Sequence, residues 1–216
     1  AKVVLAEYNL VDRPYIILVP SGLVRCYTSN YPVYVDEHYN IIRGILSDER
    51  LANMHVVLLA HVRAPGTSDK TVIEDLYQRL TDEERIRVIA ITDDLLASEA
   101  RAIIGNALFT ITGRMHAAVS SFFMRKPAIS LSYSVKYEGV IGKGLDLREL
   151  VTEASGDELW ETEQISKAVL SKINYVLENY DNLIRKIDRE VEVTTAVVIN
   201  QLESVVGDIR NIASRR

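Results

Sequence analysis

The sequence predicts an α/β protein built on a doubly wound parallel sheet. Two observations carry this prediction. Short apolar runs of strand length alternate with segments of helical character, and these runs are continuously apolar instead of alternating with polar residues. Continuous apolar runs are typical of parallel strands that helices cover on both faces. We therefore expect a β-α repeat in the first two thirds of the chain.

Five apolar runs are expected to form the strands of this sheet. Each is followed by residues with helical periodicity, and together they cover residues 15–19, 55–60, 87–91, 108–112 and 128–131. Ser68 and Ser98 belong to the residue types that cap helix N-termini, so each is expected to begin a helix. In the first of these helices the apolar face comprises Val72, Ile73, Leu76 and Leu80. The prediction is a five-stranded parallel sheet with helices between its strands.

The helix that follows residue 112 is expected to be short. Its core face should comprise Met115, Val119, Phe122 and Phe123, because these residues recur at helical spacing. The alanines and serines between them are small enough for close approach to the sheet. Pro127 ends the helix, since proline has no N–H to continue it.

After residue 150 the pattern predicts helices alone: an amphipathic one over residues 159–180 and a long one over residues 183–214. In the long segment apolar residues or Thr recur every three or four positions, at Ile184, Ile187, Val191, Thr194, Val198, Leu202, Val205, Ile209 and Ile212. This seam fits either a helix packed on its own domain or a neighbour, or a self-associating coiled coil. We divide the chain into a linker (1–14), a Rossmann-like domain (15–158) and a helical extension (159–216).

Composition excludes several classes of protein. With 30 acidic against 25 basic residues the formal net charge is −5, and no Lys/Arg stripe is present that could follow a phosphate backbone, so nucleic acid is not an expected partner. Cys26 is the only cysteine, which fits a reducing cytoplasm and provides no zinc site. No apolar run approaches the ~20 residues of a membrane span. We expect a cytoplasmic protein, free or peripheral to a membrane, that requires no metal ion or cofactor.

Residues of catalytic type follow the predicted fourth and fifth strands. Ligands of open parallel sheets bind beyond the carboxyl ends of the strands, near the N-termini of the following helices. Arg114 is expected in the loop after the fourth strand, His116 in the first helical turn and Lys136 after the fifth strand, in the adjacent crevice. Together they suggest an acid-catalysed reaction on a small anionic substrate. The alternative is that they are capping contacts and surface charge.

Further candidates for substrate binding lie at other strand ends. Ser21 and Gly22 follow the first strand, where glycine permits close backbone approach and a hydroxyl can reach a phosphate oxygen; a plain tight turn is the alternative. Arg25 is either a second anion clamp or a solvated surface residue. His61 ends the second strand and is either a substrate-orienting group or a structural histidine. Tyr133 either contacts a sugar or packs beneath the site.

The stretch from residue 113 to residue 139 resembles the polysaccharide pyruvyl transferase family. That family has the pattern R-[LM]-H-A, then a short helix ending in x-P-A, then S-Y-x-x-K; here the matching segments are GRMHA, RKPAI and SYSVKYEG. The segments ILVPSGLV and VVLLAHV, at residues 17–24 and 56–62, are similar to that family's first two strands. The resemblance extends over residues 15–150.

This resemblance implies an enzyme of GT-B architecture, in which two Rossmann-like domains face each other across a cleft. The present chain would be the C-terminal, donor-binding domain, and a complete member would carry another domain of comparable size before residue 1. Members of the family move the enolpyruvyl group of phosphoenolpyruvate to a sugar of a cell-surface polysaccharide or its precursor, forming a pyruvate ketal and releasing phosphate. The acceptor would be a sugar or a lipid-linked oligosaccharide.

The resemblance also implies roles for individual residues. Arg114 would bind the carboxylate or phosphate of the donor in bidentate fashion, His116 would be the general acid, and Lys136 would hold the departing phosphate. An arginine near Arg25 contributes to donor binding in the family. Two alternatives stay open: a GT-B glycosyltransferase with a nucleotide-sugar donor, for which Glu138 could receive the ribose hydroxyls, and a non-catalytic module that binds anionic sugars or docks through its last helix. Homo-oligomerisation also stays open.

Overall fold

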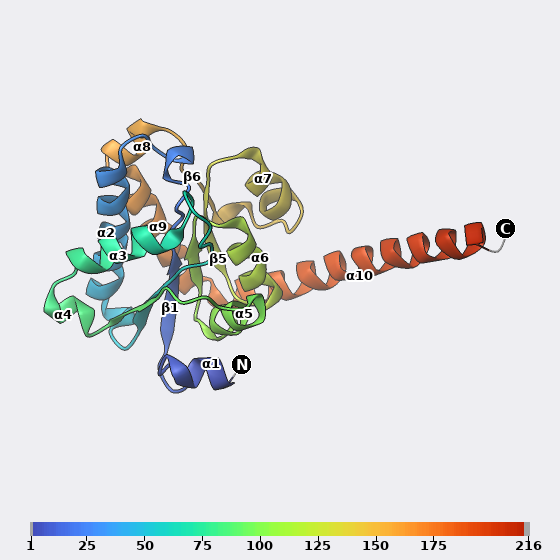
Figure 1. Ribbon diagram of the computed structural model, residues 1–216, viewed down its shortest axis with the longest axis horizontal. Helices are drawn as coiled ribbons and strands as arrows, with labels where there is room; N and C mark the ends of the chain where they lie inside the picture. The colour runs from blue at the N-terminus through green and yellow to red at the C-terminus, as the bar shows by residue number, and fades with distance from the viewer. Residues whose placement is uncertain (1, 214–216) are drawn as a thin grey trace.

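The computed structural model describes residues 2–213, and the side chains of residues 2–210. A six-stranded sheet lies between helices on both faces (Figure 1). Its strands are β1 (Tyr15–Val19), β2 (His55–Leu59), β3 (Val88–Ile91), β4 (Thr110–Thr112), β5 (Ala128–Ser132) and β6 (Val151–Glu153). All neighbouring strands are parallel, in the order β3-β2-β1-β4-β5-β6. The direction of winding reverses between β1 and β4, so the predicted doubly wound α/β fold is confirmed.

The prediction of five strands, with helices alone after residue 150, was wrong by one strand. β6 comprises the three residues Val151, Thr152 and Glu153, and it pairs with β5 at the edge of the sheet. Its burial alternates from half-buried to buried to exposed. A strand this short, covered in only one position, leaves no apolar run in the sequence. The first five strands were detectable because β1 and β5, for example, are buried at every position.

The helices fill the connections between strands. They are α1 (Lys2–Glu7), α2 (Tyr31–Ser47), α3 (Asp69–Arg79), α4 (Asp82–Arg85), α5 (Ala97–Asn106), α6 (Met115–Phe123), α7 (Val135–Tyr137), α8 (Asp157–Glu161), α9 (Gln164–Glu178) and α10 (Tyr180–Ala213). Short 3-10 turns occur at η1 (Val24–Cys26), η2 (Glu49–Leu51) and η4 (Arg148–Leu150), and residues Glu138–Lys143 form a π-helical segment, η3.

The two predicted helix starts differ in outcome. Ser68 caps α3, because its hydroxyl accepts the N–H of Lys70. The apolar face predicted for α3 is buried as expected. Ser98, however, lies inside the first turn of α5 and does not cap it. The N-cap is Leu96, whose N–H donates to the carboxylate of Glu99, so an acidic residue in the first turn takes the place of the capping serine.

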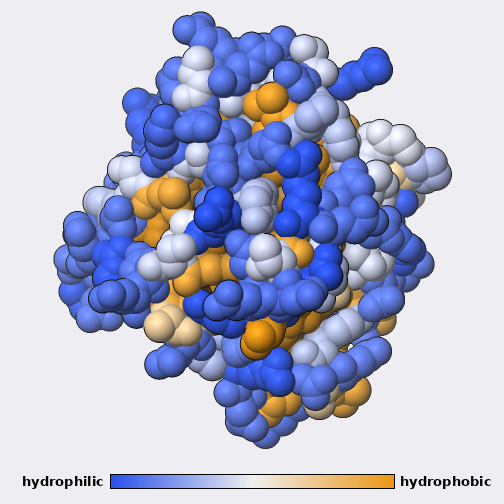
Figure 2. Space-filling view, turned by 90° about the vertical axis from the view of Figure 1, so that its left-hand side faces the viewer, coloured by the Kyte–Doolittle hydropathy of each residue, from blue (hydrophilic) through white to orange (hydrophobic). Residues whose placement is uncertain are grey.

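Alternate residues of β1 pack into two cores, one on each face of the sheet. Ile16 and Leu18 belong to the larger core, which α2, α3 and α9 cover, whereas Ile17 and Val19 belong to a smaller core beneath α1 and α5. The segment expected as a linker therefore contains a helix whose buried Val4 and Leu5 complete the smaller core. Burial of each such side chain stabilises the fold by about 1.5–3 kcal/mol. The face that carries α2, α3 and α4 is mainly hydrophilic, with hydrophobic residues in recessed patches (Figure 2).

The buried face of α6 differs from the predicted one. Its buried residues are Ala117, Ala118, Ser121 and Phe122. Val119 and Phe123, which were expected in the core, are 37% and 51% exposed. The helix thus packs on the sheet through its small residues and Phe122, and turns Val119 and Phe123 outward. Close approach of the helix to the sheet therefore outweighs the burial of these two apolar side chains.

A buried carboxylate attaches the C-terminal helices to the rest of the domain. Glu37 of α2 is 1% exposed, and its two oxygens accept the N–H of Ser166 at 2.8 Å and the hydroxyl of Ser166 at 3.0 Å. Ser166 lies in the first turn of α9, where backbone N–H groups lack partners within the helix and favour negative charge. The first turn of α9 is therefore held against α2.

The first part of α10 packs on the domain, and the remainder projects from it (Figure 1). Leu183, Ile187 and Val191 are buried in the larger core, whereas the apolar residues of the projecting part are between 45% and 60% exposed; these are Val193, Val197, Val198, Ile199, Leu202, Val205, Val206 and Ile209. The predicted long helix is confirmed; Ile212 and Ser214 lie outside the residues whose side chains are described. No helix within residues 2–213 combines the length and the apolar character that a membrane span requires.

An 11-residue spacing relates the two parts of α10. Ile187, Val198 and Ile209 are 11 residues apart, as are Leu183, Thr194 and Val205. This spacing corresponds to 3.67 residues per turn, close to that of a straight α-helix. The stripe of α10 that packs on the domain therefore continues along the same side of the projecting part. Packing on its own domain, one of the two predicted alternatives, holds for the first part of the helix.

Candidate active site

A buried aspartate joins three strand-end loops at the reversal of the sheet. Asp69, the first residue of α3, has no solvent exposure. Its Oδ1 accepts the N–H of Gly22 at 2.7 Å, and the Nε and Nη2 of Arg114 at 3.0 and 2.6 Å. Its Oδ2 accepts the N–H groups of His61 at 3.1 Å and Val62 at 2.8 Å. We call this arrangement the Asp69 hub; it links the loops after β1, β2 and β4.

The loop after β1 is built against this hub. A Cβ on Gly22 would lie 2.3 Å from the carbonyl oxygen of Ser68 and 2.5 Å from that of Thr67. The close backbone approach expected at Gly22 is thus an approach to another loop of the protein. Ser21 is buried: its N–H donates to the hydroxyl of Tyr34 at 3.0 Å, and its own hydroxyl accepts the N–H of Leu23 at 3.2 Å. The hydroxyl of Ser21 is therefore used inside the protein.

The predicted catalytic residues line one small pocket of about 230 Å³, formed by His61, Val62, Gly113, Arg114, Met115, His116, Tyr133, Ser134, Lys136 and Tyr137. These residues come from the carboxyl ends of β2, β4 and β5. The side chains of His116 and Lys136 are exposed. Arg114 is the residue before α6 and His116 lies in its first turn, as the sequence predicted. We call this cavity the small pocket.

Arg114 is engaged by the protein itself. Its side chain is 10% exposed and, besides the two bonds to Asp69, its Nη2 donates to the carbonyl oxygen of Thr67 at 2.6 Å. A bidentate grip on a donor through Nε and Nη2 would first have to displace Asp69. Sequence reasoning missed Asp69 because an acidic residue in the first turn of a helix has an ordinary explanation in the helix dipole.

His61 lines the small pocket from the side of β2. Burial is the main cause that lowers the pKa of its imidazole; Arg114 and His116 lower it further, and the nearby carboxylate of Asp69 opposes them. The imidazole of His61 is therefore neutral at neutral pH; it can donate one hydrogen bond and accept another, but it is not a general acid. Its backbone N–H belongs to the Asp69 hub. Both the orienting role and the structural role that the sequence left open are compatible with this position.

Two tyrosines fix the turn that precedes Arg114. The hydroxyls of Tyr27 and Tyr137 both donate to the carbonyl oxygen of Gly113, at 2.5 and 2.7 Å. A Cβ on Gly113 would lie 2.8 Å from the Tyr27 hydroxyl, so a side chain there would push this phenol away. The ring of Tyr133 packs edge-on against Tyr27 and Tyr137, with centroids 5.1 and 5.6 Å apart. Tyr133 thus packs beneath the site as well as lining it.

Ser134 is a site residue that sequence reasoning did not single out. Its Oγ is buried, and no hydrogen-bond partner for it exists among the described residues. Buried hydroxyls are usually paired, so an unpaired one beside a pocket is available to a ligand. Ser134 lines the small pocket together with Lys136. The sequence offered no signal for it, because serine is common in loops.

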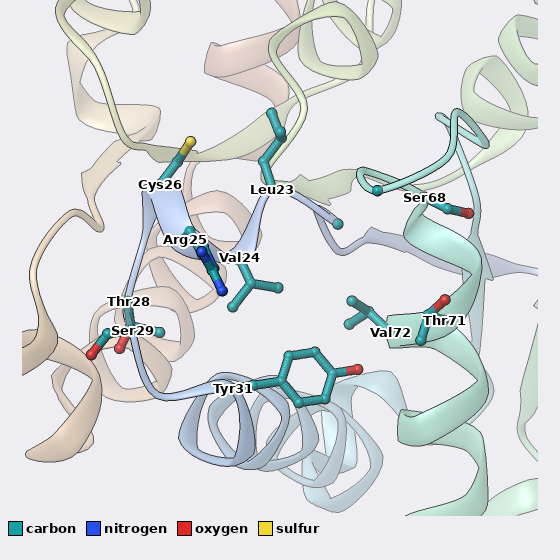
Figure 3. A pocket seen from close by; sticks show the side chains of 12 residues that line it. Leu23, Val24, Arg25, Cys26, Thr28, Ser29, Tyr31, Ser68, Thr71 and Val72 are labelled. Carbon is teal, nitrogen blue, oxygen red and sulfur yellow. The ribbon is translucent and has the colours of Figure 1, made fainter.

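Arg25 lies in a different cavity from Arg114. The loop after β1, the start of α2 and the start of α3 enclose about 590 Å³ (Figure 3), lined by Gly22, Leu23, Val24, Arg25, Cys26, Thr28, Ser29, Tyr31, Gly66, Ser68, Thr71 and Val72. We call this cavity the large pocket. Gly22 is thus a wall residue of the large pocket, and Ser21 belongs to the lining of neither. Within residues 2–213 no cluster of three His, Cys, Asp or Glu side chains is arranged to hold a metal ion.

Comparisons with known proteins show which family the chain resembles. The profile of the family described as polysaccharide pyruvyl transferase matches residues 7–135. The amylovoran biosynthesis protein AmsJ of Erwinia amylovora is 26% identical over 124 residues, which is 57% of this chain and 28% of AmsJ. The chain thus spans little more than a quarter of that relative.

Two solved structures show the same fold at low sequence identity. The ADP-heptose LPS heptosyltransferase II of E. coli superposes with a TM-score of 0.60 at 13% identity, over 83% of this chain and 51% of that one. The UDP-GlcNAc 2-epimerase of Neisseria meningitidis superposes with a TM-score of 0.55 at 11% identity, over 94% of this chain and 48% of that one. This chain therefore corresponds to about half of each.

The family profile covers more than half of the chain and includes both Arg114 and His116, together with most of the residues that line the small pocket. The resemblance first noted in the sequence around these residues is thereby confirmed. The chain belongs to the polysaccharide pyruvyl transferase family.

Proposed function

We propose that this chain is the donor-binding part of an enzyme that moves the enolpyruvyl group of phosphoenolpyruvate to a sugar and forms a pyruvate ketal. The observation that carries the proposal is the small pocket at the carboxyl ends of the strands, which His116, Lys136 and Ser134, with its unpaired hydroxyl, line together. Membership of the family supplies the reaction class. The volume of about 230 Å³ suits a three-carbon phosphate better than a larger ligand.

Lys136 and Ser134 are proposed to hold the phosphate of the donor. Lys136 presents a compact and mobile positive charge, which suits a phosphate group. The hydroxyl of Ser134 gains a partner when an anionic oxygen accepts from it, which removes the cost of a buried unpaired group. The N-terminus of α6 adds a favourable field for the anion.

His116 is proposed as the general acid. Protonation of the methylene carbon of phosphoenolpyruvate turns it into a methyl group and leaves positive charge on the central carbon. One sugar hydroxyl adds to that carbon and loses its proton; a second hydroxyl then displaces phosphate and closes the ketal. The imidazolium of His116 provides the first proton; of the two protons that the hydroxyls release, one returns to the neutral imidazole and the other leaves with the phosphate. Lys136 stabilises the phosphate as it departs.

Arg114 is given a positioning role in this proposal, in place of the bidentate grip that the resemblance implied. Its Nε and Nη2 are occupied by Asp69 and the carbonyl of Thr67. Through the Asp69 hub it holds the loops that carry His61 and Gly22, and its own backbone begins α6, on which His116 lies. Displacement of these loops by even 1 Å would disturb the reacting groups.

The remaining features of the proposed enzyme concern its acceptor, a further domain and its location. We propose that the acceptor is a sugar of a polysaccharide or of a lipid-linked precursor, that a further domain faces the strand ends of this one, and that the reaction takes place in the cytoplasm. A nucleotide-sugar donor is the weaker alternative. Glu138, the acidic residue considered for its ribose, is already ion-paired with Arg148.

Titration calorimetry on this chain tests the donor. Phosphoenolpyruvate should bind, and Lys136→Ala should weaken binding at least tenfold, about 1.4 kcal/mol. Lys143→Ala is the matched control, because Lys143 is an exposed lysine in η3 that does not line the small pocket. UDP-GlcNAc should not bind. Equal loss in both lysine variants, or binding of UDP-GlcNAc in preference to phosphoenolpyruvate, would overturn the proposal.

A further inference from the structure

The large pocket has a size and a position that the proposed donor site does not use. Its volume of about 590 Å³ lies within the range of small-molecule sites. It opens at the carboxyl end of β1, between η1, the start of α2 and the start of α3 (Figure 3). In open parallel sheets ligands usually bind at this edge, beyond the carboxyl ends of the strands where the strand order reverses.

The lining of the large pocket combines apolar side chains with hydroxyl-bearing ones. In Figure 3 the side chains of Val24, Tyr31 and Val72 point toward the middle of the cavity, whereas that of Cys26 points away. Ser68 and Thr71 line the cavity on its α3 side; in Figure 3 their hydroxyl oxygens point away from the middle, and that of Ser68 accepts the N–H of Lys70. A sugar ring has the matching character, with apolar C–H faces and hydroxyl groups around its rim. A tyrosine ring offers an apolar face of the same kind.

The charged side chain in the lining of the large pocket is cationic, and the carboxylates of Asp75 and Asp157 lie behind its wall, hydrogen-bonded to Tyr31, Thr28 and Ser29. Arg25 is the single charged side chain in its lining, and it is exposed. Arg114, by contrast, is neutralised by Asp69 and lines the other pocket. A guanidinium recognises a carboxylate or a phosphate with parallel hydrogen bonds.

The walls of the large pocket are held in place before any ligand arrives. Asp157, in the first turn of α8, accepts the hydroxyl of Thr28 at 2.7 Å and both the N–H and the hydroxyl of Ser29, at 2.7 and 2.8 Å. Tyr31 donates its hydroxyl to Asp75 of α3, which fixes the orientation of its ring. A site whose walls are already ordered loses less conformational entropy on binding.

The Asp69 hub is the common wall of the two pockets. Gly22 and Ser68 line the large pocket, and Gly22 donates to the same Asp69 oxygen that binds Arg114 of the small pocket. We infer that the large pocket binds an anionic sugar and is the acceptor subsite of the transfer reaction, with Arg25 as its anion clamp and Tyr31 as its apolar platform. The acceptor assignment rests on the proposed function.

Glycine amide signals in ¹H–¹⁵N NMR spectra of the chain can separate the two pockets. Gly66 lines the large pocket and Gly113 lines the small one. Glucuronic acid and glucose are a matched pair of probes that differ in the carboxylate. Glucuronic acid should shift the signal of Gly66, with a Kd at least tenfold below that of glucose. Phosphoenolpyruvate should shift the signal of Gly113.

Substitution of Arg25 tests the clamp. Arg25→Gln should bring the affinity for glucuronic acid to that for glucose and leave the phosphoenolpyruvate shift at Gly113 unchanged. Arg13→Gln, at an exposed arginine outside both pockets, is the control and should change neither.

Each remaining outcome decides the matter. No shift at Gly66 with either sugar would refute the sugar site, and a shift with inorganic phosphate equal to that with glucuronic acid would reduce it to an anion site. A preference for UDP at Gly66 would make the pocket a nucleotide site. Loss of phosphoenolpyruvate binding in Arg25→Gln would assign Arg25 to the donor. If glucuronic acid binds at Gly66 while phosphoenolpyruvate fails at Gly113, the sugar site stands and the proposed donor falls.

Discussion

Arg114 and His116 are two residues apart in one motif, yet they lie in opposite environments. The guanidinium of Arg114 is almost buried and is held by Asp69, a carboxylate with no exposure, whereas the imidazole of His116 is exposed at the rim of the small pocket. The boundary between loop and helix separates them, because Arg114 precedes α6 and His116 lies in its first turn. A motif read as one catalytic unit thus divides into a residue that binds other loops of the protein and a residue whose side chain is accessible to solvent.

The largest effect is expected from breaking the buried half of this comparison. Asp69→Ala would leave the Arg114 charge buried without its partner and would orphan three backbone N–H groups, so the free energy of unfolding should fall by about 3–5 kcal/mol. Urea denaturation followed by the fluorescence of Trp160, the single tryptophan, would measure it.

Glu74→Ala is the control for this prediction. Glu74 is an exposed acidic residue of the same helix, and its pair with Lys70 is solvated, so its loss should cost less than 0.5 kcal/mol. If Asp69→Ala does not fold, Asp69→Asn, which keeps one acceptor oxygen, serves instead. A change below 1 kcal/mol in either variant would show that the hub is not structural.

His38 is a buried histidine and contrasts with the exposed His116. His38 has no exposure and stacks on Trp160, and burial lowers the pKa of its imidazole from 6.5 to about 4. Below pH 6.5 the imidazole of His38 binds a proton in the unfolded chain but stays neutral in the folded chain. The free energy of unfolding therefore decreases as the pH falls from about 6.5 toward 4. The loss should reach about 3 kcal/mol.

His38→Gln isolates this contribution from that of other titrating groups. The difference in unfolding free energy between pH 7 and pH 4 should be about 3 kcal/mol smaller in the variant than in the wild type. Identical pH dependence in the two proteins would mean that the imidazole of His38 is hydrated in the folded state.

Substitution of the exposed His116 is expected to change the rate of the reaction and not the free energy of unfolding. In the active protein, His116→Ala should lower the rate of phosphate release from phosphoenolpyruvate by ~10², about 2.7 kcal/mol in activation free energy. Its free energy of unfolding should stay within 0.5 kcal/mol of the wild type, because the side chain is exposed. Full turnover in the variant would remove the acid role, and a large loss of stability would place His116 with the hub.

The smallest effect is expected in α10, where the same contrast occurs along one helix. Leu202→Ser should change the unfolding free energy of the chain by less than 0.5 kcal/mol, because Leu202 is 60% exposed on the projecting part. Leu183→Ala, at a buried position of the same helix, should cost about 2–5 kcal/mol. Denaturation of both variants measures the difference, and a costly Leu202→Ser would reveal a partner for the stripe, such as a second copy of the chain.

Features that depend on a continuous run of residues were predictable from the sequence. β1 to β5 were found because covered parallel strands are apolar at nearly every position, and the convergence of His116 and Lys136 followed from the rule that adjacent parallel strands deliver their loops to one edge. β6 escaped because three residues at an edge form no run. The outward turn of Val119 and Phe123 escaped because helical spacing does not say which side of a helix meets the sheet.

The Asp69 hub could not be read from the sequence. Asp69 and Arg114 are 45 residues apart and belong to different connections of the sheet. An aspartate after a capping serine begins many helices, so nothing local distinguishes one that turns inward. The same holds for Ser134, whose unpaired hydroxyl is a property of its surroundings and not of its neighbours in the chain.

Because α10 is long and straight, a small rotation at its base produces a large displacement at its tip. Residues 192–213 extend about 33 Å beyond Val191 at 1.5 Å per residue. A tilt of about 10° at the base of α10 would carry its tip about 6 Å. A partner that contacts the far end of α10 would therefore respond to a change in the orientation of the sheet on which the base of the helix packs.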